Sequence, residues 1–193
     1  YFRDNNYSIR SVLELIAKSN AYQLSSQFPG EWKESYAPYF ARKFVRRLKA
    51  EEVYDSLVGA TNVFYDVPIR GTDIKVRYAA EAYSPDEFVR NVNDPILKEI
   101  HFFLESFGQT NRQSSERSND GAITQAVQLM NSPLVHRQIK ASEGSYLAGL
   151  LKQEISDEEK IVRLYERFLI RRPTPTEVTD AKDIVKGGAA GWE

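Results

Sequence analysis

The stretch that decides the fold class is Asp94-Pro-Ile-Leu-Lys-Glu-Ile-His-Phe-Phe-Leu-Glu-Ser-Phe-Gly108. Asp94 is a typical N-cap, and Pro95 suits the first helical turn because an N–H there would have no partner inside the helix. Gly108 is a typical helix end. Between them the apolar residues recur at helical spacing: Ile96, Leu97, Ile100, Phe103, Leu104 and Phe107. The pattern predicts a helix with one wide face packed on a core.

Signals for helix starts recur along the rest of the chain. Ser8 or Ser11 can cap a helix beginning at Ile9, and Ser11 with Glu14 fits a capping box. Ser156 with Glu159 fits a second capping box. Helices are also predicted over 50–59, 122–130 and 146–153, and from Ser132 and Thr174 onward.

Only residues 63–79 have the two-residue period of a strand. Two alternating runs flank the turn-like segment 70–73: Val63, Tyr65 and Val67 before it, and Ile74, Val76 and Tyr78 after it. The predicted fold class is therefore mainly α, a single helical domain over residues 1–193 with a small β-hairpin near 63–79.

Composition excludes several classes of function. The chain has 193 residues and a net charge of −1, which argues against a dedicated surface for nucleic acid. It has no cysteine, so zinc–thiolate sites, iron–sulfur clusters, thiol nucleophiles and covalent c-type haem attachment are excluded within this sequence. No apolar run approaches the roughly 18–20 residues of a membrane span. No Gly-x-Ser-x-Gly elbow or glycine-rich phosphate loop is present.

Two carboxylates, Glu51 and Asp55, lie four residues apart and share one face of a predicted helix. Arg47 precedes Glu51 by four residues, and Arg46 adds a second cation. Paired carboxylates can perform acid–base chemistry. They can equally form a structural ion-pair ladder with the arginines, and this interpretation is favoured.

The most polar stretch, 109–121, leads into the N-terminus of a predicted helix near Ala122. Free backbone N–H groups and the positive helix end attract anions at such a place. The residues predicted to bind an anion or ligand are Arg112, Arg117, Ser118 and Asn119. The structural alternative is that Arg117 pairs with a carboxylate while Asn119 or Asp120 caps the helix.

The two histidines, His101 and His136, lie on different predicted helices. With a carboxylate they would suit a metal, and with Met130 they would suit haem iron. No His-x-x-x-His or Glu-x-x-His spacing selects either role, so packing is favoured and no metal site is predicted. The aromatic residues within 32–44 are interleaved with basic residues, a pattern that fits a core rim better than a nucleic-acid surface.

Three segments carry a family resemblance. They are Arg46-Arg-Leu-Lys-Ala-Glu51 with Tyr54-Asp-Ser-Leu57; Phe107-Gly-Gln-Thr-Asn-Arg112, Glu116-Arg-Ser-Asn119 and Thr124-Gln-Ala-Val-Gln-Leu-Met-Asn-Ser132; and Leu164-Tyr165 with Arg171-Arg-Pro-Thr-Pro-Thr-Glu177. Together they resemble the C-terminal domain of unknown function of planctomycete-type cytochrome c proteins. The resemblance gives Arg46, Arg47, Gln125 and Asn131 a place in the family's structural motif.

The resemblance implies a large, exported, multidomain bacterial protein, located in the periplasm, cell envelope or extracellular space, in which a cytochrome c-like module often accompanies this domain. It implies no established activity and no cofactor in this domain, with haem expected in another domain. It also implies a further helix beyond Glu193. The expected function is a non-catalytic accessory or interaction module that binds neighbouring domains of the same polypeptide. The alternative is a hydrolase or carbohydrate-active domain that uses Glu51, Asp55 and Glu116 as carboxylates, with Arg112 and Arg117 as an anion site.

Overall fold

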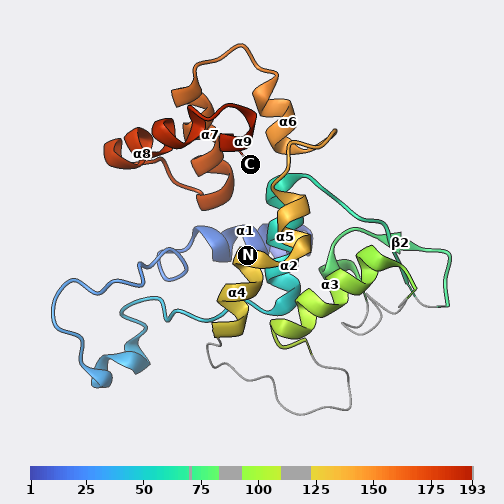
Figure 1. Ribbon diagram of the computed structural model, residues 1–193. Coiled ribbons are helices and arrows are strands. Elements are labelled where there is room, and N and C mark those ends of the chain that lie inside the picture. The colour runs from blue at the N-terminus through green and yellow to red at the C-terminus, as the bar shows by residue number, and fades with distance from the viewer. Residues whose placement is uncertain (70, 83–92, 110–122, 193) are drawn as a thin grey trace. The chain divides into compact units, whose positions relative to one another are not determined.

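The computed structural model describes residues 1–69, 71–82, 93–109 and 123–192 (Figure 1). The described part is mainly helical with one two-stranded hairpin, so the predicted fold class is confirmed. The chain divides into two compact units, Tyr1–Arg47 and Leu48–Glu193. A single domain over 1–193 stays a prediction.

The first unit contains the helix α1 (Ile9–Lys18) between two 3-10 turns, η1 (Arg3–Asn5) and η2 (Glu34–Tyr39). The Ser8 hydroxyl caps α1 by accepting from Ser11 N. The predicted capping box of Ser11 and Glu14 is wrong, because both residues lie inside the helix and Glu14 instead accepts from Lys18 Nζ at 2.5 Å. Of the two serines that the sequence offers as N-cap, Ser8 is therefore the one that caps α1, and its backbone is extended as is typical of an N-cap.

Aromatic residues form a small cluster in the first unit. The Trp32 ring makes edge contacts with Phe28, Tyr36 and Phe44 at centroid distances of 5.4–5.9 Å. The Arg42 guanidinium carbon lies 4.1 Å from the centroid of the Trp32 ring. The cation therefore covers an aromatic face, an arrangement that stabilises both groups.

The second unit begins with α2 (Ala50–Thr61) and a hairpin of β1 (Val67–Pro68) and β2 (Lys75–Val76), followed by the 3-10 turn η3 (Ala79–Glu81). The remaining helices are α3 (Pro95–Ser106), α4 (Ile123–Asn131), α5 (Pro133–Gln138), α6 (Tyr146–Leu151), α7 (Asp157–Leu169), α8 (Pro175–Val185) and α9 (Ala189–Trp192). Helices α2, α3 and α5 contact one another, and α8 contacts both α7 and α9 (Figure 1).

The main core lies where α2, α3 and α5 meet. Helix α3 buries one face, as its sequence predicts, and α2 buries residues spaced by four. The buried core residues are Ala50, Tyr54, Val58, Val67, Ala79, Leu97, Ile100, Phe103, Leu104 and Leu134. Asp94 caps α3 by accepting from Ile96 N and Leu97 N at 2.8 and 3.3 Å.

The hairpin is far shorter than the predicted 63–79. Its antiparallel pairs are Val67 with Val76 and Pro68 with Lys75. Pro68 has no N–H to donate to a ladder. The N–H groups of Arg77 and Tyr78 donate to the Glu81 carboxylate at 3.0 and 3.2 Å, so they are not available to a neighbouring strand. Side-chain acceptors outside the strand therefore limit the length of the hairpin.

Hydroxyl caps place the later helices. Ser132, Ser145, Ser156 and Thr174 cap α5, α6, α7 and α8. The full capping box is confirmed for Thr174 and Glu177. The capping box predicted for Ser156 is only half confirmed: Ser156 accepts from Glu159 N, and the Glu159 carboxylate pairs with Arg163 at 3.2 Å.

Adjacent phenylalanines on α3 test the core. Phe103 is 1% exposed and Phe102 is 59% exposed. Phe103→Ala is expected to lower the free energy of unfolding by about 3–5 kcal/mol because it leaves a cavity. Phe102→Ala is expected to change it by less than about 0.5 kcal/mol. Urea denaturation measures both, and equal losses would contradict the described burial of α3.

Candidate functional site

Asp55 holds η3 against α2. Its two carboxylate oxygens accept from Ala79 N at 2.5 Å and Ala80 N at 3.0 Å. These are the first N–H groups of η3, which have no partner within the turn itself. Asp55 therefore acts as an N-cap supplied from another helix, which is an architectural role.

The protonation of Asp55 reflects its half-buried position. Desolvation raises the pKa of the Asp55 carboxyl, the two backbone hydrogen bonds oppose this shift, and the negative charges of Glu51 and Glu81 raise the pKa further. A half-buried carboxyl with a raised pKa is also what a general acid requires. In this structure its two oxygens are occupied by backbone donors.

The other members of the predicted ion-pair ladder, Arg46, Arg47 and Glu51, do not share one face of a helix. Helix α2 begins at Ala50, so Arg46 and Arg47 precede the helix, and the predicted helical i,i+4 relation of Arg47 to Glu51 does not form. Arg46 donates from Nη1 to the Arg47 carbonyl at 3.1 Å. Glu51 accepts from Gln109 Nε2 at 3.4 Å.

Five residues of the predicted sites, Arg112, Glu116, Arg117, Ser118 and Asn119, lie outside the described residues. The anion site and the third carboxylate of the hydrolase hypothesis therefore stay predictions. The remaining motif residues, Gln125 and Asn131, lie on α4, where Gln125 is half-buried and Asn131 is exposed.

The two histidines are on separate helices of the second unit. His101 Nε2, on α3, lies 3.1 Å from Glu105 Oε1, and the His101 side chain is 42% exposed. His136 is exposed on α5. Among the described residues, no cluster of three or more histidines and carboxylates has the arrangement of a metal site.

Arg167 attaches α7 to the C-terminal end of α2. Its guanidinium donates to the Ala60 carbonyl at 3.0 Å and also to the Gly59 carbonyl, and it lies 5.1 Å from the centroid of the Tyr146 ring. The last carbonyls of a helix have no N–H donor within the helix, and they carry partial negative charge. A cation at this position therefore stabilises both elements.

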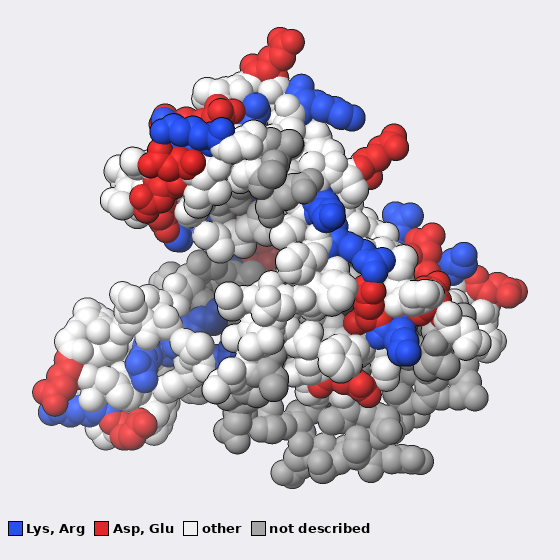
Figure 2. Space-filling model, viewed as in Figure 1, with Lys and Arg blue, Asp and Glu red and all other residues white. Residues whose placement is uncertain are grey.

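Glu177 is the centre of a second architectural cluster. Its carboxylate forms a bidentate pair with Arg171 at 2.7 and 2.8 Å and accepts from Thr174 N at 2.8 Å. The Arg171 pair, followed by the Thr174 hydrogen bond, lowers the pKa of Glu177 to about 2. Figure 2 shows acidic and basic side chains interspersed over the part formed by α7 and α8, where ion pairs such as Lys182–Glu158 occur.

A buried polar pair joins α5 to the end of α2. The Thr61 hydroxyl is hydrogen-bonded to Gln138 Oε1, and Gln138 Nε2 donates to the Val63 carbonyl at 3.2 Å. Thr61 and Gln138 are 3% and 1% exposed. No pattern in the sequence predicts this pair, because a threonine and a glutamine 77 positions apart share no local signal.

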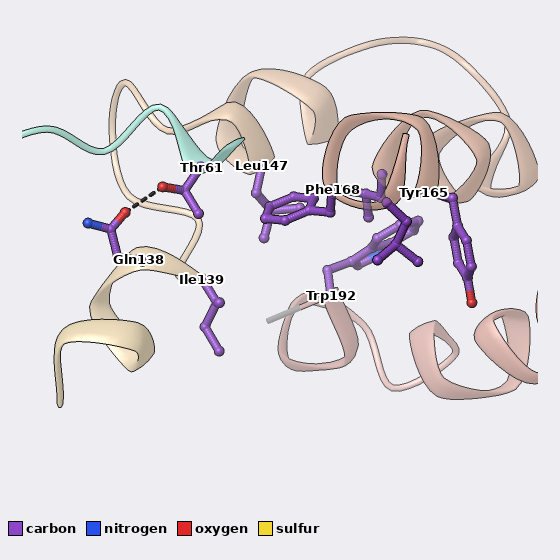
Figure 3. A pocket seen from close by; sticks show the side chains of 9 residues that line it. Thr61, Gln138, Ile139, Leu147, Tyr165, Phe168 and Trp192 are labelled. Atoms are coloured by element: carbon purple, nitrogen blue, oxygen red, sulfur yellow. Dashed lines mark hydrogen bonds between the residues drawn. The ribbon is translucent and has the colours of Figure 1, made fainter. Parts of the chain in front are cut away.

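This polar pair forms one end of a pocket of about 330 Å³ (Figure 3). Leu147 of α6 and Ile139, which follows α5, contribute to its wall. The α7 residues Leu164, Tyr165, Phe168 and Leu169 form another part, and Trp192 of α9 completes it. The apolar residues of α7 recur at helical spacing, whereas no pattern in the sequence indicates a role for Trp192, because an isolated tryptophan has no periodicity.

The chemistry of this pocket suits binding. Its lining offers aromatic and aliphatic surface and an amide and a hydroxyl that already have hydrogen-bond partners. A site of nucleophilic or acid–base chemistry needs an activated group instead.

Across the described ranges, no helix combines the length and the apolar composition required to cross a bilayer.

The fold and its site define a mainly helical domain with an apolar pocket and structurally engaged polar motifs. A model of the family "Protein of unknown function (DUF1553)", PSD1, matches residues 1–185, so the chain belongs to that family. PSD1 is the domain associated with planctomycete cytochrome c proteins, and the resemblance inferred from the sequence motifs is thereby confirmed. Comparison with curated proteins and with solved structures gave no match.

The role of Asp55 can be tested by truncation. Asp55→Ala is expected to lower the free energy of unfolding by about 1–2 kcal/mol, because two N–H groups of η3 lose their acceptors. Asp55→Asn retains one acceptor oxygen and should lose less. Asp73→Ala, at an exposed position near the hairpin turn, is the control and should lie within about 0.5 kcal/mol of the wild type. An Asp55→Ala variant as stable as this control would contradict a capping role.

The lowered pKa of Glu177 predicts that the stability of the protein depends on pH. Its pKa is depressed in the folded state, so its stabilising contribution is full above its ordinary value near 4.5 and is lost as the pH falls toward about 2. Glu177→Gln should therefore reduce the loss of thermal stability over this pH range. Glu154→Gln, at an exposed position on the surface, should leave the slope unchanged. Identical acid profiles for wild type and Glu177→Gln would argue against the Arg171 pair.

Proposed function

We propose that this chain is a non-catalytic accessory module of a larger exported bacterial protein, and that it binds neighbouring domains of the same polypeptide, including a cytochrome c-like module. The observation that carries the proposal is the engagement of the polar groups. Asp55, Glu177 and Arg167 all bind backbone groups or partner side chains of this domain. Residue types that elsewhere perform chemistry here position helices and turns.

Exposed apolar stripes support a docking role. On α4, Ile123, Val127 and Met130 are spaced by four and three residues, so they lie on one face, and they are 85%, 46% and 73% exposed. On α1, Ile9, Leu13 and Ile16 repeat the same spacing and are also exposed. Contiguous exposed apolar surface is typical of protein-interaction sites.

The hydrolase hypothesis has one observation in its favour, the raised pKa of Asp55. Its partner groups Glu116, Arg112 and Arg117 lie outside the described residues. The two functions make opposite predictions: a docking module binds its neighbours without turnover, whereas a hydrolase cleaves a substrate and loses that activity in Asp55→Asn.

The docking role is tested by the affinity of the purified chain for the adjacent domains of its own polypeptide, measured by isothermal titration calorimetry. Ile123→Glu combined with Met130→Glu is expected to weaken binding at least about tenfold, because a carboxylate would be buried in an apolar contact. Phe102→Glu, which places one carboxylate at an exposed position of α3, is the control and should bind as the wild type does.

Two results would overturn the proposed function. One is steady turnover of an ester or glycoside panel by the wild-type chain that disappears in Asp55→Asn. The other is unchanged affinity of the doubly substituted α4 variant for every adjacent domain.

A further inference from the structure

The pocket formed by α6, α7 and α9 is a second site, separate from the exposed stripe of α4. Its volume of about 330 Å³ is within the range of small-molecule sites, which extends from roughly 300 to 1,000 Å³. Figure 3 shows the Thr61–Gln138 pair at one end and the rings of Phe168 and Trp192 toward the other. Its walls therefore present aromatic side chains to whatever occupies the pocket.

The polar end of the pocket has little hydrogen-bonding capacity to offer. The Thr61 hydroxyl is bonded to Gln138 Oε1 and lies 2.8 Å from the Leu57 carbonyl. Gln138 Nε2 donates to the Val63 carbonyl. A ligand that required strong hydrogen bonds at this end of the pocket would have to break these buried contacts, which is unfavourable.

The electrostatics of the pocket select against ions. Among the described residues that line it, none carries a full charge at neutral pH. The nearby Arg167 guanidinium is bound to the carbonyls of α2, and the Lys160 ammonium, 5.9 Å from the centroid of the Trp192 ring, pairs with Asp157 at 3.5 Å. A charged occupant would lose its hydration without gaining a counter-charge. The pocket is complementary to a neutral molecule.

The turn before α9 builds the pocket wall that Trp192 provides. Gly188 has a φ of +78°, which a residue with a Cβ rarely adopts. A Cβ on Gly191 would lie 2.9 Å from Val185 Cα and would collide with the Ile184 carbonyl. Both positions require glycine if the chain is to fold back on α8. These two glycines therefore allow the turn that brings Trp192 to the pocket.

We infer that this pocket binds a small, neutral, mostly apolar molecule with a ring system that stacks on Phe168 and Trp192. The inference does not depend on the proposed docking role. It rests on the volume, the aromatic walls, the satisfied polar end and the absence of charge among the described lining residues.

The test uses two fluorescent probes with the same ring skeleton. N-phenyl-1-naphthylamine is neutral, and 8-anilino-1-naphthalenesulfonate adds one sulfonate. Titration of the wild-type chain is expected to give saturable, 1:1 binding of the neutral probe and at least about tenfold weaker binding of the sulfonate at the same site. Equal affinity for the two probes, or no saturable binding of the neutral probe, overturns the inference.

Two substitutions on the rim locate the bound probe. Phe168 and Leu169 are 43% and 54% exposed, so a glutamate is accommodated there without being buried in the core. Phe168→Glu and Leu169→Glu are each expected to weaken binding of N-phenyl-1-naphthylamine at least about tenfold. Phe102→Glu is the matched control, because it makes the same change on an exposed helical phenylalanine away from the pocket.

Far-UV circular dichroism verifies that each variant retains its helices. If one rim variant unfolds, the site is tested with the other rim variant and with the difference in affinity of the wild-type chain for the two probes. A folded rim variant that binds the neutral probe as tightly as the wild type would contradict this location of the site. The affinity of the chain for its adjacent domains is a separate measurement, so the two proposals can fail independently.

Discussion

Burial of α2 among α3, α5 and η3 is the constraint on which the rest of the second unit depends. Ala50, Tyr54 and Val58 place one face of α2 in the core, and this fixes where its other groups point. Asp55, in the middle of the helix, then meets the N–H groups of η3, and Thr61 meets Gln138 at the C-terminal end of the helix. One buried helix thus supplies a core face, a cap for a distant turn and one end of the pocket. Loss of its packing is expected to affect all three, because each depends on the position of the same backbone.

The polar groups of this domain satisfy helix ends from a distance. Asp55 supplies acceptors to the start of η3, and Arg167 supplies donors to the last carbonyls of α2. Local caps such as Thr174 satisfy the same need within one segment. The long-range contacts occupy the ionisable side chains of Asp55 and Arg167 with backbone partners, whereas the local caps use hydroxyl groups. These contacts satisfy backbone groups that the helices and turns leave unpaired at their ends.

Two kinds of apolar surface remain for binding, and their physical requirements differ. The stripe of Ile123, Val127 and Met130 lies exposed on one helix face, so it suits contact with another folded surface. The pocket beside Phe168 and Trp192 is concave and of a size for a single small molecule. A membership in PSD1 is compatible with both, since the family is one of unknown function. The two surfaces can be altered separately, which allows their roles to be distinguished.

The helical class, the family, most of the helix starts and the buried face of α3 could be predicted from the sequence, because caps and periodicity are local properties of neighbouring residues. Three further features depend on the packing of the folded chain: Asp55 caps η3, Glu81 shortens the hairpin and Gln138 pairs with Thr61. Each of these is a contact that forms only after packing has brought separate segments together, so no spacing along the chain encodes it.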